Sequence, residues 1–541
     1  MRNVTCVAAV LGAGILATAC TTRQRSPTHV AVPVPLNTAE TGIALQGELL
    51  GKYTWPIATR SKVAQAYFDQ GLRLMYSFAR DEARQSFEKA RTIDALCAMC
   101  WWGEAWTMGP YLNGAMAPVD APLAYAAAQR AEALASSSTP VERAVIKALT
   151  ARYAPTPSPE GRNVLDSAYA DAMQAVHVRY PRHQDVATLY ADALMVLEPR
   201  RGIWPMTKPS IPQIHAILEG VLARNPAHPG ACHSYIHATE TTPQVGEAQR
   251  CADLFGAAVP GVSHVNHMPS HTYNRVGRWG DATQANITAV ATDRAAGSGR
   301  GYAIYPAHNL HMLLFSAAVD GQERVAIEAA NDHAAMAGPD GVVFQAITLV
   351  RFGRFENVLE LTTAPSHPIG TGVWAFSRGL AHLRRGSSDS AAAYLKRVDS
   401  LARHTPRTRL FRVHEPAKLL GVLSNILQGE LLRSAGRSDS AIAVFRTAVA
   451  REQTLTYDEP EPLPFTSYDF LGAALLDMGR AAEAAEVYRT ALLSRPNNGW
   501  SLFGLERALR SAGRVTDANA ARARFQRAWV RSAVRLQSSR F

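Results

Sequence analysis

Residues 465–498 read FTSYDFLGAALLDMGRAAEAAEVYRTALLSRPNN, and this stretch decides the fold. Its small, aromatic and proline residues stand at places 8, 20, 24, 27 and 32 of the unit: Gly472, Ala484, Tyr488, Ala491 and Pro496. The next unit begins at Gly499, 34 residues further on, with Ala518 at place 20 and Phe525 at place 27. A period of this length predicts one supersecondary unit that is repeated along the chain.

The same spacing occurs in two earlier parts of the chain. A unit from Val422 has Gly429, Ala441, Phe445 and Ala448, and a unit from Ala64 has Gly71, Ala83, Phe87 and Ala90. The pattern resembles the tetratricopeptide (TPR) repeat, in which two helices meet at small residues and neighbouring units stack. The resemblance implies an all-α protein, a TPR-like α-solenoid built as a right-handed superhelix of helical hairpins. Strand signals are almost absent, which agrees with this expectation.

The composition is that of a chain with enough apolar residues for a large core. The 541 residues are 47% hydrophobic and 19% charged, and the net charge of +11 is spread along the chain. No basic run with interleaved aromatic residues occurs, so we expect no nucleic-acid partner. The sequence also lacks the motifs of serine hydrolases, nucleotide-binding loops and EF-hands.

The N-terminus has the pattern of an export signal. Arg2 precedes a short apolar run from Val7 to Leu16, and the small-residue sequence Ala-Thr-Ala-Cys ends at Cys20. This ending resembles the lipobox of bacterial lipoproteins, which implies lipidation of Cys20; simple cleavage is the alternative. No segment is long and apolar enough to span a membrane permanently. We therefore expect an exported protein at the cell envelope, either anchored by lipid to the periplasmic face of a membrane or soluble in the periplasm.

The chain divides into five segments by composition and repeat pattern. Residues 1–20 form the signal peptide and lipobox, and residues 21–54, rich in Pro, Thr and Ser, form a flexible linker. The remaining segments are N-terminal helical repeats with a CxxC motif (55–227), histidine-rich central repeats (228–340) and C-terminal TPR repeats (341–541).

Four cysteines are disulfide candidates in an oxidising compartment: Cys97, Cys100, Cys232 and Cys251. The motif Cys97-Ala-Met-Cys100 is followed by Trp101, whereas c-type haem attachment needs a histidine there. A structural or redox disulfide is therefore favoured at this motif. Half of a zinc site is the alternative, but the chain has no second CxxC to complete it.

Histidines are concentrated in the middle of the chain. Eight of the 17 lie between His228 and His311, in the segments HPGACHSYIHATE (228–240), SHVNHMPSHTYNRVGRW (263–279) and YPAHNLHMLLF (305–315). The repeat frame fits units that begin at Pro229, Ser263 and Ala307, each with an alanine at place 20. Seven histidines and one carboxylate then occupy places 2, 5, 9 or 12: His233, His237, Glu240, His264, His267, His271, His308 and His311.

Residues three or four places apart share one face of a helix. In the TPR family these places line the concave groove, so the resemblance implies that the side chains converge on one cavity. Pro269 complicates the middle segment, because a helix that begins near Met268 would leave His264 and His267 on the preceding loop. His228 stands before Pro229 and is interpreted as a helix cap or as a partner of a ligand.

This set of side chains predicts a transition-metal site. Neutral imidazole is the commonest protein ligand of metals, and a nitrogen-rich site without thiolate suits zinc, copper, iron or nickel. Seven histidines exceed the three or four ligands of one ion, so two ions, or one ion beside acid–base or substrate-contacting histidines, are both open. Glu240 is predicted as a further ligand or a general base. A peptide-binding or pH-sensitive groove and a purely structural role are the alternatives.

Several segments resemble a narrower group of bacterial exported TPR proteins, over roughly Ala64 to Gly321. The segments are CAMCWWGEAW, LYADALM, HPGACHSYIHATE, HMPSHTYNRVGRW and AHNLHM, and versions of HPGA-x-H-x-x-IHA-x-E and HMPSH recur in that group. This resemblance supports treating the histidines as one set and implies no particular activity. Arg80 stands where the group's Tyr-x-Phe-x-His-x-Glu-Ala motif, here Tyr76 to Ala83, has histidine.

Two functions follow from these observations. The first is an exported TPR-repeat protein whose groove binds zinc, copper or iron. Hydrolysis with metal-bound water and oxidation chemistry are both open to such a site as a metal-dependent enzyme. The second is a non-enzymatic scaffold at the cell envelope. Under either, the regular units from Val422 to Phe525 predict a protein or peptide partner.

Overall fold

The computed structural model describes residues 42–156, 161–200 and 202–541, which belong to one compact unit. These residues form α-helices and short 3-10 turns, with isolated bridges as the only β-type pairing among them. No helix in the described ranges is long and apolar enough to cross a membrane. The predicted all-α fold is confirmed. The predicted signal peptide, the lipidation site Cys20 and most of the linker lie outside the described residues.

The helices before the histidine-rich region are α1 (Lys62–Tyr76), α2 (Arg80–Ile93), α3 (Ala98–Met108), α4 (Ala121–Leu134), α5 (Pro140–Thr150), α6 (Arg162–Arg179), α7 (Gln184–Val196) and α8 (Ser210–Leu222). The histidine-rich region contains α9 (Pro229–Thr239), α10 (Gln249–Ala258), α11 (Ser263–His267), α12 (Pro269–Val276), α13 (Trp279–Ala296) and α14 (Pro306–Asp320). The helices after it are α15 (Glu323–Ala337), α16 (Val342–Arg351), α17 (Phe355–Glu360), α18 (Pro368–Arg384), α19 (Ser388–His404), α20 (Pro416–Ser434), α21 (Ser438–Glu452), α22 (Ser467–Asp477), α23 (Ala481–Ser494), α24 (Gly499–Ser511) and α25 (Val515–Ala528). The 3-10 turns are η1 (Gly47–Leu50), η2 (Pro118–Asp120), η3 (Ala135–Ser137), η4 (Val245–Ala248) and η5 (Gly338–Gly341).

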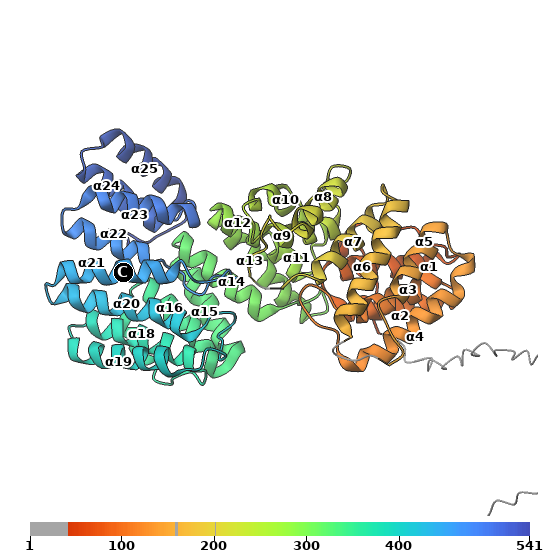
Figure 1. Ribbon diagram of the computed structural model, residues 1–541, viewed down its shortest axis with the longest axis horizontal. Coiled ribbons are helices and arrows are strands. Elements are labelled where there is room, and N and C mark those ends of the chain that lie inside the picture. The colour runs from red at the N-terminus through yellow and green to blue at the C-terminus, as the bar shows by residue number, and fades with distance from the viewer. Residues whose placement is uncertain (1–41, 157–160, 201) are drawn as a thin grey trace, which may run out of the picture. The chain divides into compact units, whose positions relative to one another are not determined.

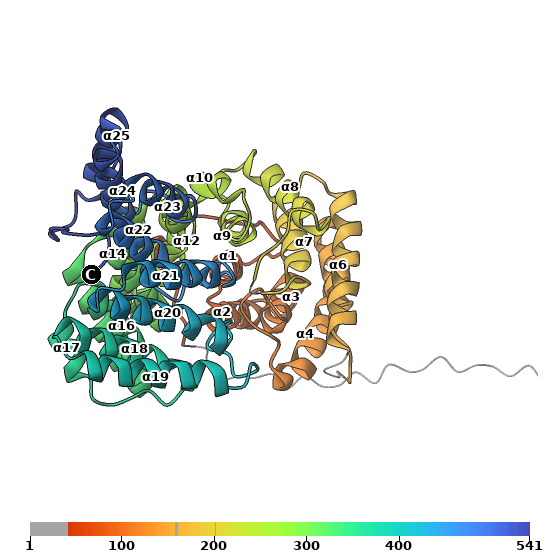
Figure 2. The ribbon, with the colours of Figure 1, turned by 60° about the vertical axis from the view of Figure 1, so that its left-hand side comes forward.

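Helices that follow one another in the chain pack side by side as hairpins, as Figures 1 and 2 show for α18 with α19 and α20 with α21. The small and aromatic places of the repeat explain this packing. Tyr488 of α23 is fully buried, and its ring lies against two glycines, Gly472 of α22 and Gly504 of α24. Phe87 of α2 lies against Gly71 and Gly103 in the same way. Each aromatic ring therefore fixes its own helix pair and the next unit at once.

Alanine at Gly504 is expected to destabilise the C-terminal units, because its Cβ would come within 2.2 Å of the Tyr488 ring. Overpacking of this kind costs about 1–3 kcal/mol. Gly220 of α8 is the matched control, since nothing lies within 4 Å of an added Cβ there. Alanine is the better helix former by up to about 1 kcal/mol, so Gly220→Ala is expected to stabilise. Denaturant unfolding of both variants checks the pair, and equal losses would contradict this packing.

The packed part of the chain begins before residue 55, although the sequence predicted a flexible linker through residue 54. Leu50 at the end of η1 is fully buried. The Tyr53 hydroxyl donates to an oxygen of Asp185 at 2.8 Å and lies 2.7 Å from Nε2 of His228. Nδ1 of His228 accepts from the backbone N–H of Ala231, so this histidine caps α9, as predicted.

The four disulfide candidates pair within two local bridges. Cys97 bonds to Cys100 at the start of α3, and Cys232 of α9 bonds to Cys251 of α10. All four residues are buried. The second bridge joins the helix that carries His233 and His237 to the helix packed behind it, and it thereby supports the histidine-rich region.

Candidate metal centre

The predicted ligands come from four helices within residues 229–320, with α10 and α13 between them. They are His233 and His237 of α9, Glu240 directly after α9, His264 and His267 of α11, His271 of α12, and His308 and His311 of α14. His308 is half-buried, and no other side chain of this set is more than 3% exposed. Groups this polar are buried only where they have partners, so their partners decide what the site does.

Pro269 divides the middle segment into α11 and α12 but leaves its histidines on helices. Proline has no N–H to donate and is tolerated in the first turn of a helix, where it stands in α12. The N–H of Met268 still bonds to the carbonyl of His264 at 3.0 Å. His264 and His267 therefore lie on a short helix and not on a loop.

His267 and His271 point their Nε2 atoms at each other, 2.8 Å apart. Nδ1 of His267 lies 2.8 Å from Oδ1 of Asn286, whose amide orientation is fixed because its Nδ2 donates to the Ala282 carbonyl. Oδ1 of Asn286 therefore accepts, and Nδ1 of His267 carries the proton. Nδ1 of His271 lies 2.5 Å from Oε2 of Glu240 and donates to it. When both rings are neutral, each of the facing Nε2 atoms is therefore unprotonated and carries a lone pair.

Two facing lone pairs repel each other unless a cation lies between them. A proton can join one such pair as an imidazolium. A metal ion about 2 Å from each nitrogen also fits, because two nitrogen ligands of one ion stand roughly 3 Å apart. This arrangement, with Nδ1–H directed to an oxygen acceptor and Nε2 directed inward, is the one that metal-ligating histidines adopt.

A second pair also brings two Nε2 atoms together, but a hydrogen bond fixes the tautomer of only one of its rings, His233. Nδ1 of His233 lies 2.6 Å from the carbonyl oxygen of Tyr76, which can only accept, so Nδ1 carries the proton. Nε2 of the neutral His233 ring is then unprotonated and carries a lone pair. This Nε2 lies 3.2 Å from Nε2 of His264. Within the described residues, Nδ1 of His264 and Nε2 of His237 are buried without a hydrogen-bond partner. The cluster therefore contains more inward nitrogens than its hydrogen bonds use.

Three groups of side chains offer ligand atoms that all lie within 4.8 Å of one another in the described part of the chain. The groups are His233 with His237 and His264, His267 with His271 and His308, and His237 with Glu240 and His271. The first two groups share no residue. Six of the seven predicted histidines and Glu240 thus meet in one cluster, and the first two groups give it room for two ions.

His311 is the predicted ligand that these groups leave out. Its Nδ1 lies 3.1 Å from Nη1 of Arg412, which can only donate, and its ring centroid lies 3.8 Å from that of Phe344. The sequence placed His311 in register with the other histidines correctly. It gave no sign of Arg412, which comes from a part of the chain about a hundred residues later and approaches this ring.

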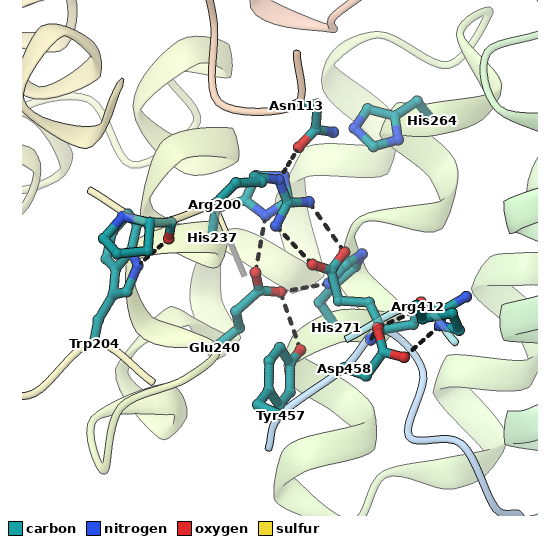
Figure 3. A network of polar contacts seen from close by, with 12 residues as sticks. Asn113, Arg200, Trp204, His237, Glu240, His264, His271, Arg412, Tyr457 and Asp458 are labelled. Atoms are coloured by element: carbon teal, nitrogen blue, oxygen red, sulfur yellow. Dashed lines mark hydrogen bonds and ion pairs between the residues drawn. The ribbon is translucent and has the colours of Figure 1, made fainter. Parts of the chain in front are cut away.

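Glu240 orients two histidines of the cluster. One oxygen lies 3.2 Å from Nδ1 of His237; the other lies 2.5 Å from Nδ1 of His271 and accepts from the Tyr457 hydroxyl at 3.2 Å (Figure 3). With both oxygens accepting, Glu240 has the geometry of a carboxylate that fixes the tautomers of metal ligands. Its carboxylate also offers a ligand atom in the third group, and the predicted roles as ligand or general base stay predictions.

Burial keeps most of the cluster uncharged. It lowers the pKa of His233 and His264 well below the usual value, and neighbouring imidazoles add to this shift. Burial also lowers the pKa of His267, to about 3. Burial opposes charge on His271 as well, but the Glu240 carboxylate outweighs it and raises the pKa of His271. Neutral imidazole is the form that binds metals.

Acidic and basic side chains that were not predicted from the sequence cover one side of the cluster. Arg200 binds both oxygens of Glu459, at 2.7 and 3.2 Å, and Oε2 of Glu459 lies 3.9 Å from Nδ1 of His271. Arg412 binds Asp458 (Figure 3). Glu459 is in the proline-rich stretch Glu459-Pro-Glu-Pro-Leu-Pro464, which lies between two repeat units. Its acidic residues beside the prolines were the available signal.

Arg80, at the position where the narrower group has histidine, binds backbone and an aromatic ring outside the cluster. Its guanidinium donates to the carbonyl oxygens of Thr107 and Gly109 and stacks on Tyr111. Phe78, two residues earlier, packs against the rings of His233, His237 and His264. This part of the motif therefore contributes an apolar wall to the cluster and no ligand.

A cavity of about 360 Å³ opens beside the cluster. It is lined by His264 and His308, one residue from each of the two separate histidine groups, and by Tyr305, Arg200, Arg412 and Glu459. The half-buried His308 is the side chain through which the cluster is reached from this cavity.

Comparisons with known proteins bear on the repeat and not on the cluster. No curated protein sequence matches the chain. Among solved structures, the APC/C hetero-tetramer Cut9–Hcn1 is similar at 14% identity and a TM-score of 0.30, over 86% of this chain and 76% of that chain. The human IFIT1 dimer with m7Gppp-AAAA is similar at 10% identity and a TM-score of 0.32, over 87% of this chain and 90% of that chain. Scores this low carry no argument about function.

One family assignment follows from the sequence itself. Residues 465–498 match the tetratricopeptide repeat, over the unit from which the period of 34 was first recognised. In the structure this unit is the hairpin of α22 and α23, with Tyr488 against Gly472. The chain therefore carries a tetratricopeptide repeat at residues 465–498.

Proposed function

We propose that the protein holds a transition-metal centre of two ions in the histidine cluster. The observation that carries this proposal is the 2.8 Å approach of two Nε2 atoms, on His267 and His271, whose Nδ1 protons are already directed to Asn286 and Glu240. An extra proton at His267 or His271 would relieve this approach, but buried nitrogens of His237 and His264 would still lack partners. Two ions, one in each separate histidine group, would bind one nitrogen of each of the six rings.

The donor set restricts the metal. Six imidazoles and no thiolate suit zinc, copper, iron or nickel and disfavour calcium and magnesium, which prefer oxygen ligands. The sulfur of Cys232 is bonded to Cys251 in a disulfide and therefore offers no thiolate ligand. An ion in either group would supply Lewis-acid or redox chemistry to a molecule in the adjoining cavity. We propose on this basis that the centre serves a metal-dependent reaction.

The experiment is metal analysis of the full protein after chelation, reloading with zinc, copper(II) or iron(II), and removal of free ions. Two ions per chain are expected for the best-fitting metal. His267→Ala/His271→Ala and His233→Ala/His264→Ala are each expected to retain one ion, because each variant removes two ligands of one group only. Combining all four substitutions is expected to leave none.

The control variant is His382→Ala/His404→Ala, which removes two histidines outside the cluster and is expected to keep both ions. Circular dichroism checks that every variant keeps its helices. A parent protein that retains no metal while its helices are intact would overturn the proposal. Equal loss of metal in the control variant would show that binding is unspecific.

We also propose that the protein acts after export and belongs to the narrower group of exported bacterial TPR proteins. Two disulfides, Cys97–Cys100 and Cys232–Cys251, support an oxidising compartment, in which such bonds persist. The signal-peptide pattern that ends at Cys20 supports the same location, as a lipid-anchored or a soluble periplasmic protein. Fractionation of cells with the parent and a Cys20→Ala variant tests both points. The parent is expected outside the cytoplasm; if lipid anchors it in the membrane fraction, the variant is expected to lose this membrane association.

The second candidate function is a protein-binding scaffold. It is favoured by the tetratricopeptide repeat at residues 465–498, because arrays of such helix pairs present extended binding surfaces. The two functions are compatible, with metal in the central helices and a partner on the C-terminal units. Absence of metal from a folded parent protein is the result that would leave the scaffold as the better account.

A further inference from the structure

A second, larger cavity lies next to the one beside the metal centre. It has a volume of about 600 Å³ and is formed by residues 110–118 with parts of α6 and α7 and the loop after α7. Asn113 and Arg200 line both cavities. Nε of Arg200 donates to Oδ1 of Asn113, so the two side chains form one shared wall (Figure 3).

The lining of this larger cavity is mainly apolar. Leu112, Met116, Leu165, Met195 and Val196 contribute side chains to it. Its volume lies within the 300–1,000 Å³ of cavities that hold small organic ligands. Met116 and Leu165 are half-buried, so their side chains cover the cavity and remain partly exposed to solvent.

The charged side chains of the larger cavity are already paired. Arg162 binds Asp166 at 2.9 Å. Glu198 accepts from Lys208 at 2.5 Å and from Ser210 at 2.6 Å. Arg200 binds Glu459. A charged ligand would therefore lack a counterion here, and no ion pair would offset the free-energy cost of removing its charge from water. A neutral apolar group is the occupant that fits.

The smaller cavity is the more polar of the two, although Phe344 and Ala307 also line it. Polar atoms from His264, His308, Glu459 and Arg412 reach it, and the hydroxyl of Tyr305 lies 2.7 Å from that of Tyr111, which lines the larger cavity. An apolar chamber and a polar chamber with metal-ligating side chains therefore meet at Asn113 and Arg200.

We propose that the protein binds a small organic molecule with a neutral apolar body, held in the larger cavity, and a polar end that faces the metal centre across Asn113 and Arg200. The proposal rests on the metal centre only for the role of the polar end. The apolar chamber stands on its own lining and paired charges. We expect the apolar body to have the size of one or two aromatic rings, which is smaller than the cavity of about 600 Å³.

The test uses three probes and two double variants. 2-Naphthol is a neutral apolar body without a metal-binding end. Acetohydroxamate is a metal-binding end without a body, and 2-naphthohydroxamate carries both. Met116→Trp/Leu165→Trp fills the apolar chamber. Val119→Trp/Val164→Trp is the matched control, because these neighbours of the two residues are 74% and 70% exposed and do not line the cavity.

Calorimetry or fluorescence measures the affinities, first on metal-free protein. 2-Naphthol is expected to bind the parent and the control variant and to bind Met116→Trp/Leu165→Trp at least ~10-fold more weakly, because burial of a ring system contributes more than the 1.4 kcal/mol of a tenfold change. Failure of 2-naphthol to bind the metal-free parent, or equal binding to the filled variant, would overturn the proposal.

Metal-loaded protein then tests the polar end. 2-Naphthohydroxamate is expected to bind at least ~10-fold more tightly than acetohydroxamate to the parent, and the two are expected to bind equally to the filled variant. Equal affinities in the parent would overturn the proposal for the polar end. If the protein retains no metal while 2-naphthol binding behaves as expected, the metal centre has failed and the apolar chamber has not.

Discussion

Chelation of the metal is expected to loosen the histidine-bearing helices by several kcal/mol while leaving the hairpins α18–α19 and α20–α21 unchanged. An ion present at a thousand times its dissociation constant stabilises every state with an intact site by about 4.1 kcal/mol. In a stack of helix pairs each unit is stabilised by its neighbours, so the effect stays local. Amides of α9, α11, α12 and α14 are expected to exchange up to roughly 1,000-fold faster after chelation.

Hydrogen exchange followed by mass spectrometry measures this effect segment by segment. The internal reference is the pair of hairpins α18–α19 and α20–α21, whose amides contribute nothing to the cluster. The variant with all four substitutions at His233, His264, His267 and His271 provides the second control, and chelation is expected to change nothing in it. Uniformly faster exchange across the whole chain would mean that the ion has a general effect and no specific site.

Glu240→Gln is expected to weaken metal binding by about 10- to 100-fold without unfolding the protein. Glutamine keeps the size of the side chain but has one accepting oxygen and one donating amide. It cannot accept from Nδ1 of both His237 and His271. One ring must then move its proton to Nε2, the nitrogen that faces the other ligands. Competition titration against a coloured chelator measures the loss.

Tyr457→Phe is the control for this substitution. It removes one hydroxyl that donates to Glu240 at 3.2 Å and leaves the carboxylate able to orient both rings. A much smaller loss of affinity, less than about fivefold, is expected from a single neutral hydrogen bond of about 1 kcal/mol. If Tyr457→Phe weakens binding as much as Glu240→Gln, the tautomer argument is wrong and general disturbance of the site explains both.

The sequence was sufficient to predict the hairpins and the direction of the histidines. Both depend on spacing along one helix: Gly472 and Tyr488 fix the packing of their pair, and His233 and His237, one turn apart, must share a face. The frame from residues 465–498 carried over to the central units because their helices begin where it placed them, at Pro229 and Ser263. Periodicity within a helix is local information, and one chain suffices to show it.

The partners of the histidines could not be predicted, because nothing local specifies them. Asn286 reaches His267 from the following helix, and its role depends on a bond between its own amide and the Ala282 carbonyl. Tyr457 reaches Glu240 across 217 residues of sequence. His311 illustrates the same limit, since its register is that of a ligand and only the approach of Arg412 gives it another neighbour. Contacts of this range depend on how the whole stack curves.

The return of residues 457–459 to the histidine cluster restricts how this protein can evolve. Helical arrays usually gain and lose whole units, because each unit meets only the units beside it. Here Glu459 meets Arg200 across 259 positions, and the hairpins from α15 to α21 act as a spacer of set length between them. Duplication or deletion of any one of these hairpins would move Glu459 away from its partners. We therefore expect relatives of this chain to keep the number of hairpins between α15 and α21.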